Sequence, residues 1–290
     1  MSIASSELIL NPDGSIYHLN LRPEHIAHDI IFVGDQDRIS RITNHFDSIE
    51  FTTQKREFRT ETGMYKGKRL TVISTGIGPD NIDIVLNELD ALVNIDLETR
   101  KIKEKLTSLN IIRIGTSGSL HKDIPVDSFV MSAYGLGMDN MMRCYDIDMH
   151  SNVDLENAFI EQTHWDSNRG RPYVTACSPE LEKLIESDRI HKGITATAPG
   201  FYGAQGRVLR LGLVHNTLND KLAAFDYNGI RVTNLEMETA AIYGLSKLLG
   251  HNALSLSAIV ANRAAGKFSS NPDKTIDELI IYTLNKIAAV

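Results

Sequence analysis

The sequence predicts an α/β protein built around a mixed β-sheet. Short apolar runs typical of buried strands recur along the chain, and segments with apolar residues at helical spacing lie between them. A polar/apolar alternation around Tyr65-Lys66-Gly67-Lys68 predicts an antiparallel hairpin. The 290 residues, 42% of them hydrophobic, suit one large core or two smaller ones, and we expect a single domain over residues 1–290.

Composition limits the classes of partner. The net charge of -7 provides no basic surface for nucleic acid. No apolar run approaches the ~18 residues of a membrane span, and the first residues lack the basic and apolar segments of a secretion signal. We therefore expect neither a nucleic-acid nor a membrane partner. Cys144 and Cys177 lie far apart, so we expect free thiols in a cytoplasmic protein.

The first half of the chain is divided by glycine, proline and hydrophobic periodicity. An extended arm containing His18 precedes Pro23, because proline limits helix propagation. The next helix should place Ile39, Ile42 and Phe46 on one face. In order, the expected elements are a strand at 30–33, a helix after Gly34-Asp35, the hairpin at 55–75, an amphipathic helix at 81–93 and a charged, helix-rich surface insertion at 96–109 without chemistry.

The second half continues the alternation of strands and helices. Ser178-Pro179 predicts a helix start, because proline is favoured at the first helical position. Strands are expected at 128–134, 173–176, 194–198, 230–234 and 254–261, and helices at 154–165, 179–187, 236–249 and 273–289.

The run 111–118 is apolar except for Arg113 and ends in small residues. It predicts a buried strand that feeds a tight, anion-binding turn, at the strand end where ligands of parallel sheets gather. A buried guanidinium keeps its charge, so Arg113 needs either a protein carboxylate or a ligand phosphate. Arg38 lies in the first turn of its helix, where a cation opposes the helix dipole, and is either exposed or holds an anion.

Glycine signatures of other enzyme classes are incomplete. Gly76-Ile77-Gly78 and Gly135-Leu136-Gly137 lack the third glycine of a dinucleotide-binding fingerprint, and 115–119 lacks the second glycine of a nucleophile elbow. Without a dinucleotide-binding fingerprint, a hydride-transfer function loses its main support. His25 and His28 have no third ligand nearby, which favours a surface pair over a metal site.

Three polar clusters follow the ends of segments. The stretch 201–207 offers two aromatic rings, an amide and an arginine, which suit either an ordinary loop or a binding surface. Glu236 and Glu238 stand where a strand runs into a helix, so they either cap the helix or accept hydrogen bonds from a vicinal diol such as that of ribose. Asn262-Arg263 ends the last strand.

Eight motifs, in order across nearly the whole chain, resemble those of the nucleoside phosphorylase-I family, most closely its uridine phosphorylase branch. They are Tyr17-His18-Leu19, Gly34-Asp35 with Arg38, Arg56-Glu57-Phe58, Ser74-Thr75-Gly76-Ile77-Gly78, Arg113-Ile114-Gly115-Thr116, Phe201-Tyr202 with Gln205 and Arg207, Glu236-Met237-Glu238 and Asn262-Arg263. The resemblance implies a mixed, partly barrel-like sheet flanked by helices. It also implies reversible phosphorolysis of uridine to uracil and ribose 1-phosphate in pyrimidine salvage or catabolism.

The same resemblance implies roles for individual residues. Phosphate, a co-substrate, would be bound by Gly34, Arg38, Arg56, Arg113 and Thr116. Ribose would be bound by His18, Glu236, Met237 and Glu238, and the base by Phe201, Gln205, Arg207 and Arg263. His18 and Arg56 would reach in from a partner subunit, which requires a homo-oligomer, either a dimer or a hexamer built as a trimer of dimers. No cofactor is implied, apart from a monovalent cation near Glu57 and Ser74.

Uracil fits this residue set chemically. One edge presents acceptor, donor and acceptor, which Gln205 and Arg207 can complement. A purine site in this fold would be expected to carry an aspartate near the last strand, where this chain has Asn262-Arg263. We expect Gln205 and Arg207 to stabilise the departing uracil anion, because arginine is a poor proton donor. The expected catalytic residues are Arg113, Thr116, Gln205, Arg207 and Glu238.

Arg38 and Arg56 would bind the same anion as Arg113. We therefore expect the partner of the Arg113 guanidinium to be phosphate rather than a protein carboxylate, with Thr116 between phosphate and sugar. Alternatives within the fold are a purine nucleoside phosphorylase and a nucleoside hydrolase. A non-catalytic nucleoside-binding protein is the alternative from another class. The three arginines discriminate, because neither a hydrolase nor a binding protein needs a phosphate site.

Overall fold

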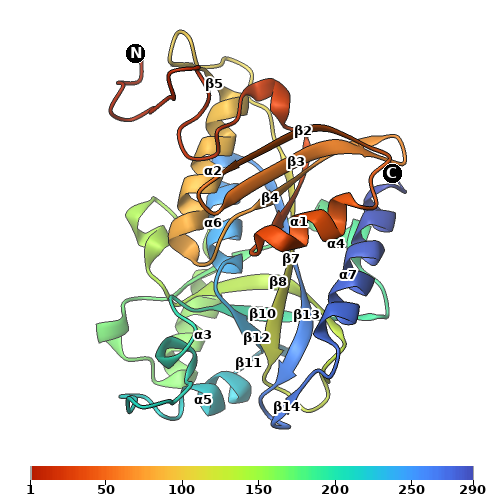
Figure 1. Cartoon of the computed structure of the whole chain (residues 1–290). Helices are drawn as coiled ribbons and strands as arrows, with labels where there is room; N and C mark the ends of the chain where they lie inside the picture. Colours follow the sequence, from red (N-terminus) through yellow and green to blue (C-terminus); the bar gives the residue numbers. More distant parts are fainter. Residues whose placement is uncertain (1, 290) are drawn as a thin grey trace.

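The computed structural model describes residues 2–289. A mixed sheet of 12 strands forms its centre and confirms the predicted fold class (Figure 1). The strand order is β11-β12-β10-β8-β13-β7-β1-β4-β3-β2, with β9 paired to β8 and β14 to β13. The strands of this sheet are β1 (Asp29–Val33), β2 (Ser48–Lys55), β3 (Phe58–Tyr65), β4 (Lys68–Ser74), β7 (Asn110–Ser119), β8 (Phe129–Gly137), β9 (Tyr173–Ala176), β10 (Ile190–Thr197), β11 (Asp226–Tyr227), β12 (Ile230–Glu236), β13 (Asn252–Asn262) and β14 (Lys267–Phe268).

Five of these strands close into a barrel-like ring. In addition to its pairing with β10, β12 pairs antiparallel with β7, which joins the two ends of the run β12-β10-β8-β13-β7. Asn234 lies opposite Ser119 and Leu235 opposite Gly118, so the carboxyl ends of β7 and β12 meet. β1 runs parallel to β7 and ends beside it. The polar residues at these strand ends are therefore brought to one place.

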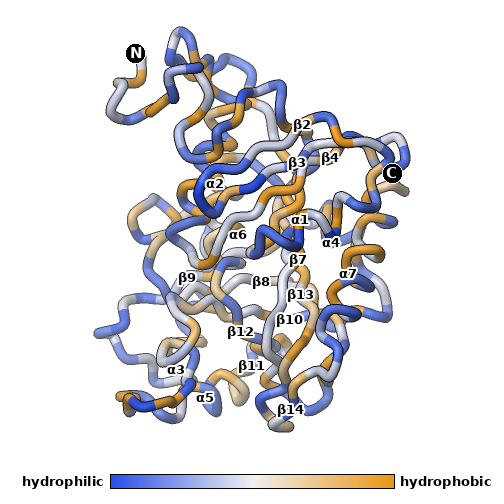
Figure 2. Tube along the Cα trace, in the orientation of Figure 1, coloured by the Kyte–Doolittle hydropathy of each residue, from blue (hydrophilic) through white to orange (hydrophobic). Residues whose placement is uncertain are grey.

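Helices cover the sheet (Figure 1). α6 packs on β8, β10 and α2, while α7 packs on β13 and β7. Strands at the centre are largely apolar and the surface segments largely polar (Figure 2), as expected for a sheet buried by helices. The α-helices within residues 2–289 are α1 (Gln36–Thr43), α2 (Pro79–Asn94), α3 (Val153–Thr163), α4 (Pro179–Ile185), α5 (Leu218–Ala224), α6 (Thr239–Leu249) and α7 (Pro272–Ile287). None of the helices in this described part is long and apolar enough to cross a membrane.

The prediction of a helix-rich insertion at 96–109 is wrong. The segment contains two short paired strands, β5 (Ile95–Asp96) and β6 (Lys101–Ile102), followed by irregular chain. The Asp96 carboxylate accepts hydrogen bonds from the backbone N–H groups of Glu98 and Thr99 at 3.0 and 2.8 Å. Such a side-chain bond competes with helix formation and stabilises a turn, which explains the error.

The prediction of a tight turn within 111–118 is also wrong, because β7 continues through the small residues at the end of this run to Ser119. Its neighbours β13 and β12 supply pairing partners along this stretch, so the backbone stays extended. The helix α1 ends at Thr43, before Phe46, and α6 begins at Thr239 rather than at Glu236. Neither β2 nor α5 was predicted from the sequence.

Candidate active site

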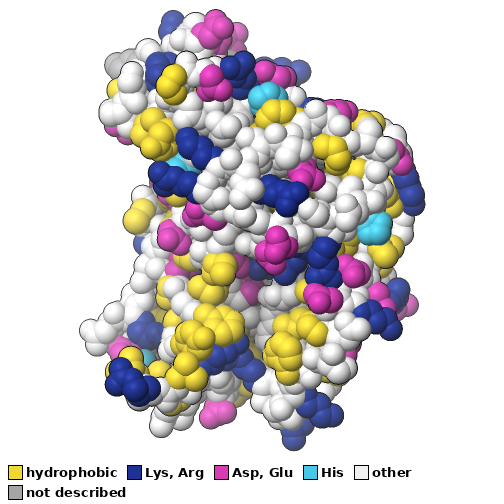
Figure 3. Space-filling view, in the orientation of Figure 1, with side chains coloured by type: hydrophobic (Ala, Val, Ile, Leu, Met, Phe, Trp, Pro, Cys, Tyr) yellow, Lys and Arg dark blue, Asp and Glu magenta, His cyan; other side chains and the backbone are white. Residues whose placement is uncertain are grey.

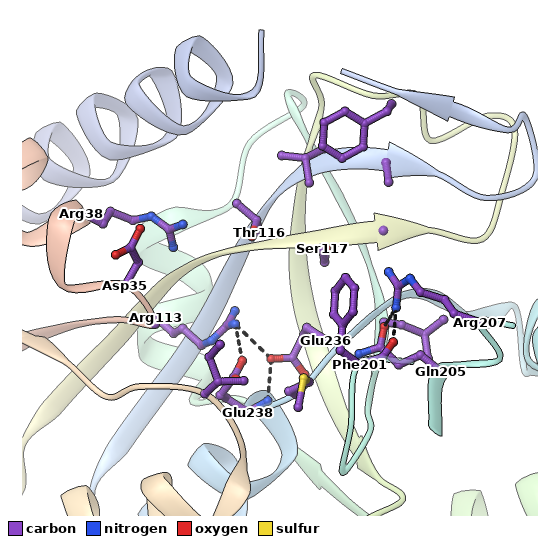
Figure 4. A pocket seen from close by; sticks show the side chains of 18 residues that line it. Asp35, Arg38, Arg113, Thr116, Ser117, Phe201, Gln205, Arg207, Glu236 and Glu238 are labelled. Atoms are coloured by element: carbon purple, nitrogen blue, oxygen red, sulfur yellow. Dashed lines mark hydrogen bonds and ion pairs between the residues drawn. The ribbon is translucent and has the colours of Figure 1, made fainter. Parts of the chain in front are cut away.

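A cavity of about 370 Å³ opens where β7, β12 and β13 end. Apolar side chains gather on both sides of a hollow in the lower half of the face seen in Figure 3. The cavity is lined by Gly34, Asp35, Arg38, Ile77, Arg113, Thr116, Ser117, Gly118, Phe201, Gln205, Arg207, Leu235, Glu236, Met237, Glu238, Val260, Ala261 and Phe268. Arg38 and Asp35 stand at one end and Gln205 with Arg207 at the other, with Arg113 and the two glutamates between them (Figure 4).

One end of the cavity is cationic. Arg38 projects from the first turn of α1, where Asp35 caps the helix by accepting from the N–H of Asp37. One guanidinium nitrogen, Nη1, donates to the backbone oxygen of Ile114 at 3.2 Å, and the buried Nε has no partner among residues 2–289. Burial, followed by repulsion from Arg113, lowers the pKa of Arg38 to about 10. An anion placed between the two guanidinium groups would relieve that repulsion.

Arg113 is shared between two carboxylates. Its Nη2 lies 2.6 Å from Glu238 Oε2 and 3.3 Å from Glu236 Oε2. The expectation that phosphate rather than a protein carboxylate is the partner of Arg113 is therefore corrected, because both glutamates already contact one side of the guanidinium. Burial opposes the charge, but the attraction of the two glutamates outweighs it and raises the pKa of Arg113. On the other side, the buried Nη1 has no partner in the described residues and is available to an anion.

Gly115 makes room for this arrangement. A Cβ atom at that position would lie 2.0 Å from Arg113 Nη1 and 2.5 Å from its Cζ. The side chain of Arg113 thus folds back along its own strand over the space that glycine leaves open.

Glu236 and Glu238 differ in what they hold. Glu238 Oε1 accepts from the N–H of Gly78 at 2.9 Å, while its Oε2 faces Arg113. Burial first, and the nearby charge of Glu236, raise the pKa of Glu238 even though Arg113 acts in the opposite direction. Glu236 Oε2 instead accepts the backbone N–H groups of Glu238 and Thr239, both at 2.9 Å, and its Oε1 accepts from the hydroxyl of Thr197. Glu236 therefore satisfies two buried backbone donors at the start of α6, where a helix leaves its first N–H groups without an intrahelical partner.

The other end of the cavity joins an amide to two arginines. Gln205 Oε1 accepts from Arg207 Nη1 at 2.7 Å and from Arg263 Nη2 at 2.8 Å. The guanidinium of Arg207 lies over the ring of Phe201, 3.8 Å from its centroid. Arg263 does not line the cavity and contacts Gln205, which does.

His18 and Arg56 lie outside the cavity of their own chain. His18 Nδ1 is 2.6 Å from Glu88 Oε1, and Arg56 is exposed at the turn between β2 and β3, with its guanidinium 6.0 Å from the ring centroid of Tyr17. Glu57 and Ser74, near which a monovalent cation was expected, do not line the cavity either. The fully buried Ser74 hydroxyl donates to the backbone oxygen of Glu57. Within residues 2–289 no group of three His, Cys, Asp or Glu side chains could hold a metal ion.

Several lining residues were missed by the sequence analysis. Ser117 and Gly118 follow Thr116 directly on β7, so the position of the motif could have indicated them. Ile77 lies within the motif Ser74-Thr75-Gly76-Ile77-Gly78. Phe268 is 69% exposed on the two-residue strand β14, and no local pattern marks it because it reaches the cavity only through pairing of β14 with β13.

Comparisons with known proteins agree on the family. The sequence profile described as "Phosphorylase superfamily" matches residues 29–286. A uridine phosphorylase of Thermococcus kodakarensis is 28% identical over 271 residues, covering 93% of this chain and 86% of that protein. A DeoD-type purine nucleoside phosphorylase of Listeria monocytogenes is 25% identical over 270 residues, covering 92% and 97%. Among solved structures, a Trypanosoma brucei nucleoside phosphorylase described as showing uridine phosphorylase activity has a TM-score of 0.88 and 31% identity, covering 98% of this chain and all of that one.

Proposed function

The chain belongs to the phosphorylase superfamily, and we propose that it is a uridine phosphorylase, a pentosyltransferase that converts uridine and phosphate to uracil and ribose 1-phosphate. The observation that carries the proposal is the order of groups along one cavity. Arg38 stands at one end, Arg113 with two buried carboxylates in the middle, and an amide with an arginine at the other end. Arg38 and Arg113 each have a buried nitrogen without a partner in residues 2–289.

Phosphate would occupy the cationic end. Arg38 Nε and Arg113 Nη1 would donate to its oxygens, and charge-assisted bonds of this kind are stronger than neutral ones. Thr116 would add a hydroxyl between phosphate and sugar, and Gly34 would allow close approach of the backbone. Arg56 of a second subunit would complete the site, as His18 would for the ribose 5′-hydroxyl, so we propose a homo-oligomer with shared sites, either a dimer or a trimer of dimers.

The ribose would lie over the centre of the cavity. Glu238 would accept hydrogen bonds from the diol, and Met237, half-buried beside it, would pack against the sugar. We assign Glu236 a supporting task instead of direct contact with ribose, because its carboxylate is engaged by two backbone N–H groups and a hydroxyl.

In the reaction, a phosphate oxygen would form a bond to C1′ while the bond from C1′ to N1 of uracil breaks. The electron pair of the broken bond stays on uracil, where Arg207 and Gln205 would stabilise the negative charge while Phe201 packs against the base. No organic cofactor is needed, since phosphate is the co-substrate. We also propose a role in pyrimidine salvage in the cytoplasm, where Cys144 and Cys177 would remain thiols.

The test is incubation of the protein with uridine, inosine or thymidine, each with and without phosphate, followed by measurement of the free base. We expect phosphate-dependent release of uracil from uridine. Release at equal rates without phosphate would indicate a hydrolase and refute the proposal. The Listeria relative makes a purine phosphorylase the second candidate, which predicts preferential cleavage of inosine.

A further inference from the structure

Arg263 holds Gln205 at two points. It follows the end of β13, and its Nη2 donates to the side-chain oxygen Oε1 of Gln205 at 2.8 Å. Its Nη1 donates to the backbone oxygen of Gln205 and lies 3.3 Å from Asn219 Oδ1. Gln205 lines the cavity and is only 2% exposed, so Arg263 holds a buried amide rather than one on the surface.

These contacts fix which end of the amide is which. A guanidinium has donors and no acceptor, so the atom that faces Arg263 must be the oxygen. Arg207 Nη1 donates to the same oxygen from a second direction, at 2.7 Å. A flipped amide would place its NH2 group against two cations and leave donors facing donors, which is costly in a buried site. Within residues 2–289, the Gln205 NH2 group has no hydrogen-bond acceptor and remains for a ligand.

We propose that Arg263 is a positioning residue that locks the polarity of the Gln205 amide and thereby selects a base with an N–H between two carbonyl oxygens. The proposal rests on the proposed function and deepens it. The locked amide presents a donor, Nε2, beside an acceptor, Oε1, and Arg207 adds a donor on the side of the oxygen (Figure 4). Uracil presents the complementary order of carbonyl, N–H and carbonyl in either direction.

Arg207 donates to a lone pair of Gln205 Oε1 that the N–H of the base would also need. A carbonyl oxygen has two lone pairs, and those of Gln205 are occupied by Arg263 and Arg207. When the base binds, its N–H takes the lone pair of Gln205 Oε1 that Arg207 held. Arg207 is half-buried and stacks on Phe201, so it can swing to the neighbouring carbonyl of the base without leaving a buried donor unpaired.

Cytosine is rejected by the same lock. Its N3 carries a lone pair, which would face the oxygen of Gln205, and its amino group would face either Nε2 or Arg207, both of which are donors. If the amide could rotate, its NH2 group would satisfy N3 and remove the first mismatch. The lock therefore converts an amide that could serve both pyrimidines into one that serves uracil.

The test compares uridine with cytidine. Arg263→Met removes both donors while keeping a long side chain, and Arg263→Lys keeps the charge but can no longer hold the two oxygens with a planar fork. We expect Arg263→Met to lower the ratio of kcat/KM for uridine to that for cytidine about 10-fold or more, because each buried mismatch relieved is worth on that order. Arg263→Lys should fall in between. Asn219→Ala is the matched control: it removes the other acceptor near Arg263 Nη1 and should leave the ratio unchanged.

A purely structural role for Arg263 would lower both rates together and leave the ratio intact. A ratio within 2-fold of wild type in a folded Arg263→Met variant, judged by its melting temperature, would overturn the proposal. Equilibrium dialysis of uracil and cytosine in the presence of phosphate serves as a second readout. If the wild-type protein releases no uracil from uridine, the proposed function fails, while the relative binding of the two bases by wild type and variant still reports on the lock.

Discussion

Replacing Gly115 by alanine adds one methyl group beside the central arginine of the site. The new Cβ would lie 2.0 Å from Arg113 Nη1, 2.5 Å from Cζ and 2.7 Å from Nη2. Non-bonded atoms prefer separations of about 3.5 Å, so the guanidinium must move by roughly 1.5 Å. Its 2.6 Å hydrogen bond to Glu238 cannot survive such a shift, and Nη1 would no longer face the cavity as it does now.

The displaced guanidinium should weaken both phosphate binding and the stability of the fold. A hydrogen bond between charged groups contributes about 1.5–3 kcal/mol, which corresponds to roughly 10- to 150-fold in rate. We therefore expect kcat/KM for phosphate to fall about 100-fold. The clashing atoms are the free end of a side chain rather than backbone, so the overpacking itself should lower the free energy of unfolding in urea by only about 1–2 kcal/mol. The lost hydrogen bond to Glu238 should lower it by about a further 1.5–3 kcal/mol.

The assay is the initial rate of uracil release at saturating uridine with phosphate varied, alongside urea unfolding of the same preparations. Gly212→Ala provides the matched control, because a Cβ there meets no atom within 4 Å and its φ is not in the left-handed region. If folded Gly115→Ala kept kcat/KM for phosphate within 3-fold of wild type, Arg113 could not be acting from the position described.

Two further predictions use the ionisation of buried groups. Burial and the charge of Glu236 raise the pKa of Glu238, so activity that needs the Glu238 carboxylate should be lost as pH falls through a pKa above that of an ordinary glutamate. Glu236→Gln removes one cause, so the acidic limb of kcat/KM for uridine should move to lower pH, and an unmoved limb would contradict the assignment. Burial raises the pKa of Cys177 to about 11, whereas Cys144 is exposed. Iodoacetamide at pH 8 should therefore modify Cys144 in the native protein and both cysteines in urea, as read by mass spectrometry; equal labelling of the two in the native state would show that Cys177 is accessible.

Local signals predicted the elements with strong periodicity. The expected strand at 173–176 coincides with β9, and the hairpin turns at Lys66-Gly67 as its alternation indicated. Prediction failed where a local side-chain bond or a neighbouring strand decided the outcome. Asp96 diverts its segment into a turn, and pairing with β12 and β13 keeps β7 extended through Gly115 and Gly118.

The sequence alone determined the chemistry available to this protein: arginines for an anion, carboxylates at a helix start, and an amide with an arginine in an aromatic loop. Tertiary structure alone decided how those groups pair. The closing of β12 onto β7 brings Glu238 to Arg113 across 125 positions of sequence. Among residues 2–289 it leaves Nη1 of that arginine without a partner and available to an anion. Contacts between distant segments likewise orient the Gln205 amide, because the hydrogen-bonding direction of an amide depends on its neighbours in space, which no local pattern in the chain records.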